Sequence, residues 1–236
     1  MMQHVLPPLP YDYAALEPWI DAPTLRVHHD FHHWKCVERL NRVEQQLATL
    51  RIQGNSRPLR RMKRLAAWCA AEDVLHCLFW NVMGPHRGGW PRDDLADQIA
   101  DDFGSFADFK SRFTAMATGL PSSGWVLLAW QPAGGQQLTI ITTDRHHQLG
   151  NDVCLLLGLD LWPHAYIRKY QTRRAEYVHN WWNTVNWSRV AQSFAAVARA
   201  RREVSVTPAQ RRDNYESTLA ADPAAPRASR SHAGVR

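Results

Sequence analysis

Two long stretches with apolar residues at helical spacing dominate the first third of the chain. The first runs from Asp21, a residue type that can cap a helix, to about Leu50. Along it, residues three or four positions apart would share one face: Leu25, His28, His32, Val37, Leu40, Val43 and Leu47. The second covers about 58–83 and follows a Gly-Asn-Ser break at 54–56. Two long helices joined by a short break predict an antiparallel helical hairpin.

The pattern changes beyond a segment at 85–94 whose Pro and Gly content is typical of a linker. The later chain predicts two short helices (95–102, 105–116), three strands (125–131, 136–143, 153–160) and a last helix (174–200). The predicted fold class is therefore α+β. A helical hairpin domain (1–87) would precede an α/β domain (88–200) with a small three-stranded antiparallel sheet.

The formal net charge of +6 comes from 28 Lys and Arg against 22 Asp and Glu. Residues 199–236 hold eight arginines and four acids, and so carry +4, which leaves +2 for the preceding 198 residues. We expect a basic tail over 201–236 to be disordered, because its few apolar residues cannot offset the entropy of ordering it. We interpret the tail and the basic run 57–64 as solvated surface rather than a nucleic-acid site.

The four cysteines form no Cys-x-x-Cys pair, which is typical of a reducing compartment: Cys36, Cys69, Cys77 and Cys154. The first residues lack the charged and apolar regions of a secretory signal. No window approaches about 18 uninterrupted apolar residues, the length a membrane helix needs. We therefore expect a cytoplasmic protein without a membrane span.

Histidine and carboxylate combine in three separate strings. VHHDFHHW (27–34) presents two histidines on each of two neighbouring helix faces. His76 follows in DVLHCLFW, and Asp160 and His164 follow in DLWPH. Three imidazoles and one carboxylate would suit Fe, Mn or Zn without any thiolate. Each histidine alone is more often a packed core residue, so the order of the strings carries the argument.

Seven strings, in order along the chain, resemble the iron/manganese superoxide dismutase family: LPPLPYDYAALEP (6–18), VHHDFHH (27–33), LHCLFWN (75–81), DDFGSFADFK (101–110), SGW (123–125), LDLWPHAY (159–166) and EYVHNWWNTVNW (176–187). The resemblance covers about residues 5–200. It implies that His28, His76, Asp160 and His164 bind one Fe or Mn ion per chain. It also implies an enzyme that converts superoxide into O2 and H2O2.

The resemblance also implies a residue that contacts the solvent molecule on the metal. In most members of the family, a glutamine side chain forms a hydrogen bond with that solvent molecule. Here Glu72 occupies the helix position for that residue, and His146 occupies the strand position, with His147 as the alternative register. A subgroup with histidine at the strand position tends to use iron. We therefore favour iron over manganese.

Other matches lie around the expected site. Trp80, Trp125 and Trp162 match the aromatic cage that the family packs around its metal. His32 and Arg174 match residues at the substrate funnel, where Arg174 would add positive potential that steers superoxide.

Two positions depart from the family pattern. Cys36 replaces the usual gateway tyrosine, and a thiol is only a weak hydrogen-bond donor. It would also be open to oxidation by H2O2 if its pKa were low. Pro163 replaces a glutamate that reaches a ligand histidine across the dimer, although Tyr166 is retained. A homodimer is still expected, without that bridge.

Two other functions are compatible with these residues. The metal site could serve a different O2 or peroxide reaction, given Cys36 and Pro163. Alternatively, the fold could be a structural or RNA-associated protein that uses the basic tail. Such a protein would not require four intact metal ligands, and all four are present. The sequence therefore predicts a superoxide dismutase.

Overall fold

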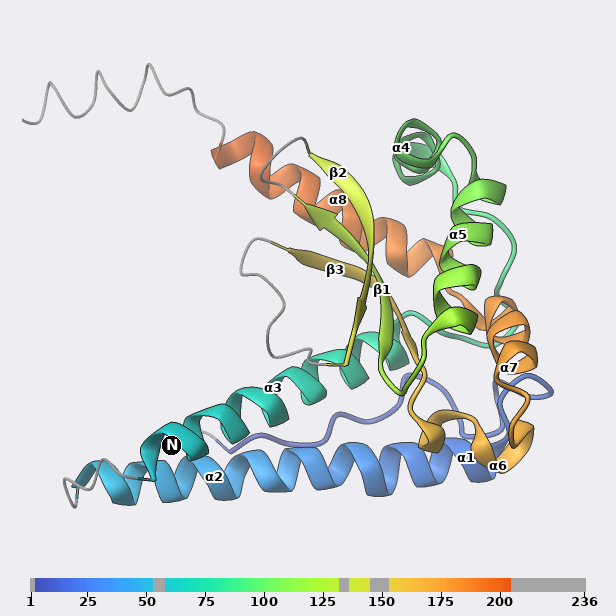
Figure 1. The fold of residues 1–236 in the computed structure, drawn as a ribbon. Coiled ribbons are helices and arrows are strands. Elements are labelled where there is room, and N and C mark those ends of the chain that lie inside the picture. The colour runs from blue at the N-terminus through green and yellow to red at the C-terminus, as the bar shows by residue number, and fades with distance from the viewer. Residues whose placement is uncertain (1–2, 53–57, 132–135, 145–152, 205–236) are drawn as a thin grey trace, which may run out of the picture. The chain divides into compact units, whose positions relative to one another are not determined.

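The computed structural model describes residues 3–52, 58–131, 136–144 and 153–204. It confirms the α+β class, with a helical hairpin followed by further helices and a three-stranded antiparallel sheet (Figure 1). The chain divides into two units, Met1–Ala195 and Ala196–Arg236, and the site described below lies in the first. Residues 201–204 of the expected tail are helical, whereas 205–236 lie outside the described residues.

The hairpin is built from two long helical arms. In the first arm, α1 (Ala22–Val27), a π-helical turn (His28–His33) and α2 (Trp34–Ile52) follow one another without a break. The second arm, α3 (Leu59–Asn81), packs along α2 (Figure 1). The apolar side chains at helical spacing are buried between them and the rest of the unit: Leu25, Val37, Leu40, Val43, Leu47, Leu75 and Phe79. The spacing thus predicted the packed face, but it did not predict the π-helical turn.

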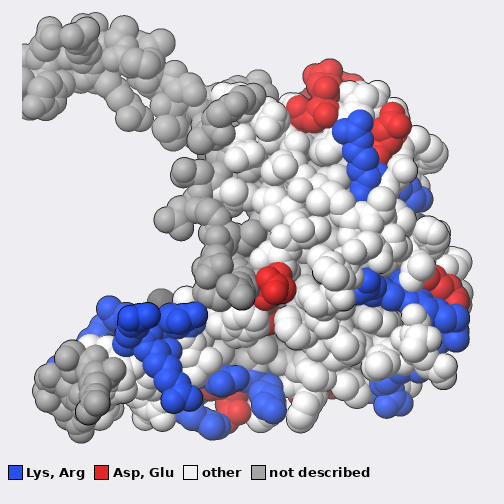
Figure 2. Space-filling view, in the orientation of Figure 1, with Lys and Arg blue, Asp and Glu red and all other residues white. Residues whose placement is uncertain are grey.

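The basic run lies at the start of α3. Arg60, Arg61, Lys63 and Arg64 are all exposed there. Figure 2 shows Lys and Arg side chains gathered over this end of the hairpin. Their exposure to solvent is compatible with the interpretation of this run as solvated surface.

The sheet has β1 (Trp125–Gln131) at its centre, with β2 (Gln137–Thr143) and β3 (Cys154–Asp160) antiparallel on either side. Residues 125–130 of β1 are buried. The register pairs Trp125 with Asp160, so the end of β3 lies beside the start of β1. A Cβ atom on Gly158 of β3 would lie 3.1 Å from Leu78 Cδ2. This close approach fits the sheet tightly against α3.

The remaining elements are α4 (Asp93–Phe103), α5 (Phe106–Gly119), a 3-10 turn (Pro163–Ala165), α6 (Ile167–Tyr170), α7 (Arg174–Trp181), a second 3-10 turn (Trp182–Thr184) and α8 (Trp187–Val204). Of these, α4 and α5 pack against strands of the sheet. Ser105 caps α5, as its residue type suggests, by accepting a hydrogen bond from the Asp108 N–H at 3.0 Å. Phe113 stacks on Trp181 with ring centroids 5.8 Å apart. An aromatic core therefore joins α5 to α7.

The prediction of one unbroken helix over 174–200 was wrong. Between α7 and α8 the chain forms a 3-10 turn and then an extended residue, Val185, which pairs with Met83 just after the end of α3. There the Gly84 N–H donates to Thr184 O at 2.9 Å and the Asn186 N–H donates to Val82 O at 2.7 Å. These backbone hydrogen bonds between distant segments outweigh the local preference for a continuous helix.

In the part of the chain that the structure describes, no helix combines the length and the apolar character needed to cross a bilayer.

A substitution of Gly124, just before β1, tests how closely the backbone at the start of β1 packs against the end of β2. A Cβ atom there would lie 2.7 Å from the backbone oxygen of Thr143. We expect Gly124→Ala to lower the free energy of unfolding by about 1–3 kcal/mol, since the backbone must shift to relieve the overlap. Gly119→Ala is the matched control, because nothing lies within 4 Å of its added Cβ. Equal stabilities of the two variants in urea unfolding would contradict this packing.

Candidate metal centre

Four side chains from four elements converge at one place in the first unit. His28 comes from the π-helical turn, His76 from α3, Asp160 from the end of β3 and His164 from the following 3-10 turn. One potential ligand atom from each lies within 4.8 Å of the other three. His28, His76 and Asp160 are buried, and 17% of the His164 side chain is exposed. The structure therefore brings together all four residues that the sequence predicted as ligands.

The two carboxylate oxygens of Asp160 have different surroundings. Oδ1 accepts a hydrogen bond from the Trp162 backbone N–H at 2.7 Å. Oδ2 lies 3.1 Å from His28 Nε2 and 3.2 Å from His164 Nε2. The Tyr177 hydroxyl also donates to the Asp160 backbone oxygen, at 3.0 Å. These contacts hold the carboxylate with Oδ2 directed at the histidines.

The tautomer of His76 follows from one backbone contact. Its Nδ1 lies 2.7 Å from the Glu72 carbonyl oxygen, which can only accept, so Nδ1 carries the proton and donates. Nε2 is then the unprotonated nitrogen, with a lone pair available to a metal. Such a hydrogen bond on the far ring nitrogen is the usual way in which proteins orient a histidine ligand.

Two buried nitrogens of this group have no hydrogen-bond partner, namely His28 Nε2 and His76 Nε2. His28 Nε2 approaches Asp160 Oδ2 closely without the geometry of a hydrogen bond. Leaving a buried polar atom unpaired costs about 1–3 kcal/mol. A metal ion bound by the four side chains would satisfy both nitrogens, so the residues present fit such an ion.

Burial sets the protonation states of these groups. Desolvation lowers the pKa of His76 to about 4 and holds the pKa of His28 well below its usual value. Burial alone would raise the pKa of Asp160, but the charge and the hydrogen bond of His164 hold it below its usual range. At neutral pH the site therefore has a carboxylate and at least two neutral imidazoles.

Aromatic rings enclose the histidines. The Trp80 ring lies 4.6 Å from the His28 ring, and the Trp125 ring lies 5.5 Å from the His76 ring, measured between centroids. Phe79, which sequence reasoning did not assign to the cage, lies 5.5 Å from the His28 ring. Trp162 is half-buried and contributes the backbone hydrogen bond to Asp160.

The two expected funnel residues differ in their surroundings. His32 stacks on His164 with ring centroids 4.2 Å apart, so it lies beside the most exposed candidate ligand. The Arg174 guanidinium donates to the carbonyl oxygens of Thr118 and Ser122, each at 3.1 Å, and also to that of Leu120. Arg174 therefore braces the segment between α5 and β1. Its steering role stays a prediction.

Cys36 has the surroundings of an unreactive thiol. Burial, helped by the negative charge of the nearby Glu72 carboxylate, raises the pKa of Cys36 to about 12. The condition for ready oxidation, a low pKa, is therefore not met. Glu72 itself is buried on α3. His146 and His147 lie outside the described residues.

Pro163 begins the 3-10 turn that carries His164. The ring of proline fixes φ in the range that the first position of such a turn needs. Its side chain is exposed. Pro163, which stands where the family pattern has a bridging glutamate, is thus also the residue that starts the turn carrying the candidate ligand His164.

Comparisons with known proteins agree with this geometry. The family model for the α-hairpin domain of iron/manganese superoxide dismutases matches residues 3–84, and the model for their C-terminal domain matches residues 91–193. The chain belongs to the iron/manganese superoxide dismutase family. Members of this family bind Fe or Mn.

Curated relatives carry the same family name with different metals. The chain is 38% identical to superoxide dismutase [Mn/Fe] of Propionibacterium freudenreichii subsp. shermanii, over 81% of this chain and 96% of the relative. It is 38% identical to a probable superoxide dismutase [Fe] of Bacillus subtilis, over 81% and 68%. It is 36% identical to superoxide dismutase [Mn] of Mycolicibacterium smegmatis, over 83% and 95%. The names of these relatives do not select one metal.

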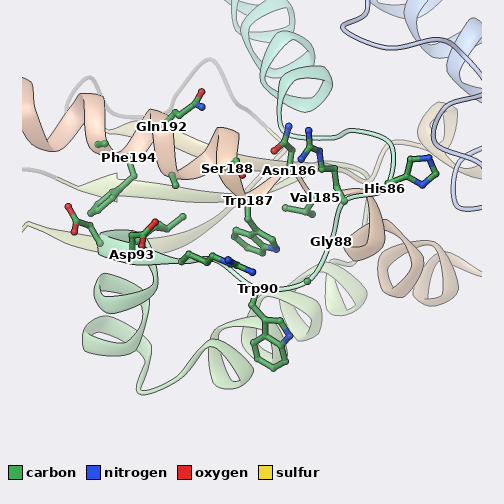
Figure 3. Close-up of a pocket in the computed structure, with 17 residues that line it drawn as sticks. His86, Gly88, Trp90, Asp93, Val185, Asn186, Trp187, Ser188, Gln192 and Phe194 are labelled. Atoms are coloured by element: carbon green, nitrogen blue, oxygen red, sulfur yellow. The ribbon is translucent and has the colours of Figure 1, made fainter.

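A separate pocket of about 800 Å³ lies between the linker and α8 (Figure 3). The described side chains that line it include Trp90, Asp93, Trp187 and Phe194, and none of the four candidate ligands. It is therefore distinct from the metal centre.

The lowered histidine pKa values predict how the metal-free chain responds to pH. His28 and His76 stay neutral in the folded state, while in the unfolded state they take up protons near pH 6.5. Stability should thus be full above pH 6.5 and fall towards pH 5, by at most about 1.4 kcal/mol per pH unit for each histidine. Urea unfolding at several pH values measures this. His76→Gln should flatten the dependence; an equally steep curve would contradict the assignment.

Proposed function

We propose that this chain is a superoxide dismutase that holds one Fe or Mn ion through His28, His76, Asp160 and His164. The observation that carries the proposal is the pair of unpartnered buried imidazole nitrogens, on His28 and His76, in one cluster with the buried Asp160 carboxylate. Membership of the dismutase family supplies the reaction class. When bound, such an ion would alternate between two oxidation states, taking an electron from one superoxide and giving it to the next.

The residues of the chain contribute electrostatics and shape to this reaction. One carboxylate cannot neutralise a divalent or trivalent cation, so the site keeps a net positive charge that attracts the superoxide anion. Trp80, Trp125 and Phe79 surround the histidines with apolar surface, which limits entry of water and strengthens this attraction. His32, stacked on His164, lines the more exposed side.

We propose iron as the metal in the cell. The support is the histidine pair at 146 and 147, which falls where an iron-using subgroup of the family has histidine. Either residue could be the one that contacts metal-bound solvent.

We also propose a cytoplasmic homodimer. Three large apolar side chains are exposed on or next to the elements that carry two candidate ligands: Phe31 (51%), Trp34 (45%) and Ile167 (51%). Phe31 lies in the π-helical turn with His28, and Ile167 begins α6 soon after His164. A second copy of the chain would remove this apolar surface from water. We also propose that each subunit consists of a helical hairpin domain, residues 1–87, followed by an α/β domain, residues 88–200.

A ligand substitution tests the proposed site. His76→Ala should reduce bound Fe plus Mn from about one ion per chain to a small fraction, and lower kcat/KM for superoxide by more than about a hundredfold. His179→Ala is the matched control, because His179 is exposed on α7. Metal analysis and pulse radiolysis measure the two effects, with circular dichroism to verify the fold. Unchanged activity in His76→Ala would refute the site.

A second prediction concerns Cys36. A positioned general acid contributes about 10²–10⁴-fold to a rate, but this half-buried thiol is a weak donor. Cys36→Ala should therefore lower the dismutation rate by less than about tenfold. A loss above a hundredfold would show that the thiol supplies the proton. Cys36→Tyr is the complementary variant: a large gain would indicate that the native site is tuned for a different O2 or peroxide reaction.

A further inference from the structure

A second cluster of polar side chains lies beside the metal centre. His33, the last residue of the π-helical turn, is completely buried, and its Nε2 lies 2.7 Å from Asp73 Oδ1 on α3. The Cys77 thiol approaches the same oxygen at 3.7 Å. On the other side of the ring, Trp80 Nε1 lies 3.1 Å from His33 Nδ1.

The direction of these hydrogen bonds can be deduced from their chemistry. The indole N–H of Trp80 can only donate, so His33 Nδ1 must be the unprotonated, accepting nitrogen. The proton of the neutral ring then lies on Nε2, which donates to the Asp73 carboxylate. The chain of donation runs from Trp80 to His33 to Asp73. Each side chain is thereby held in one orientation.

The same deduction argues against a second metal ion. Potential ligand atoms of His33, Asp73 and Cys77 lie within 4.8 Å of one another, a nitrogen, oxygen and sulfur set that could suit zinc. A metal would require an unprotonated Nε2. The proton would then move to Nδ1, where it would face the Trp80 N–H and break a buried hydrogen bond at a cost of about 1–3 kcal/mol.

Two members of this hydrogen-bonded series, His33 and Trp80, contact two of the four candidate ligands. The His33 ring stacks on the His76 ring, with centroids 4.9 Å apart and planes inclined by 10°. The Trp80 ring meets the His28 ring edge-on at 4.6 Å. A π-helical turn closes with i to i+5 hydrogen bonds, so residues five apart, such as His28 and His33, are brought towards the same side. The local irregularity of the helix thus places a ligand and its neighbour against α3.

We propose that Asp73 is a positioning residue of the metal centre, which through His33 fixes the Trp80 indole and the ring of His76. This inference rests on the proposed function only because it takes the four candidate ligands to be a metal centre. The hydrogen bonds among Trp80, His33 and Asp73 are present in the folded protein without a metal. Asp73 is not one of the four candidate ligands; it acts on them through His33.

The first test examines the chain of hydrogen bonds without dismutase activity. The full-length protein is loaded with diamagnetic Zn²⁺ alone, and histidine 15N NMR reports which nitrogen of His33 carries the proton, with His33→Gln to assign the signals. We expect a protonated Nε2, an unprotonated Nδ1 and about one zinc per chain. A protonated Nδ1, or a second zinc that is lost in Cys77→Ala, would overturn the proposal.

The second test measures the effect on the centre in Mn²⁺-loaded protein. Asp73→Leu should change the electron paramagnetic resonance spectrum and weaken metal binding by about tenfold, the lower end for partners of metal ligands. Asp73→Asn, which can still accept from His33, should restore the wild-type spectrum. Cys77→Ala is the control, because it leaves the hydrogen bonds among Trp80, His33 and Asp73 intact. A wild-type spectrum and affinity in Asp73→Leu would overturn the proposal.

The two failures are distinguishable. If the protein fails to dismutate superoxide but shows the expected tautomer and spectral shift, the proposed function is wrong and the positioning role stands. If it dismutates superoxide while Asp73→Leu leaves the spectrum unchanged, only the positioning role is wrong. Should Asp73→Leu not fold, the tautomer of wild-type His33 still decides the outcome.

Discussion

The structure depends on one buried carboxylate, that of Asp160, which has no exposed surface. A buried charge is costly unless it is paired and hydrogen-bonded. Here the Trp162 N–H satisfies one oxygen, and the other oxygen lies among histidines from both halves of the chain. The hairpin and the sheet must therefore meet at this point for the charge to be tolerated. The close fit of Gly158 against Leu78 is what lets β3 deliver the carboxylate to α3.

Much of the fold could be predicted because local patterns determine it. Helical spacing identified the buried faces of the hairpin, and strand-like segments around turn residues identified the sheet. The break between α7 and α8 could not be predicted, since it depends on hydrogen bonds from Gly84 and Asn186 to distant segments. The π-helical turn was missed for a similar reason. One residue more per turn leaves almost no trace in a spacing pattern.

For the site, the order of several strings was more informative than any single histidine. A histidine on an apolar helix face is ordinarily a packed core residue, and His33 is such a residue in the literal sense, buried and hydrogen-bonded. Its partner Asp73 is 40 positions away and resembles any surface charge of a helix. Only the tertiary structure distinguishes it. Similarly, Cys36 reads as a reactive thiol from its place in the sequence, whereas burial beside Glu72 raises its pKa.

We propose that four side chains of this protein hold one redox metal ion. Anomalous diffraction at the iron and manganese absorption edges, from crystals of the full chain purified without added metal, tests it most directly. We expect one peak per chain, in bonding contact with the Nε2 atoms of His28, His76 and His164 and with Asp160 Oδ2. Crystals with no peak at this position, and only water hydrogen-bonded to His28 and His76, would contradict it.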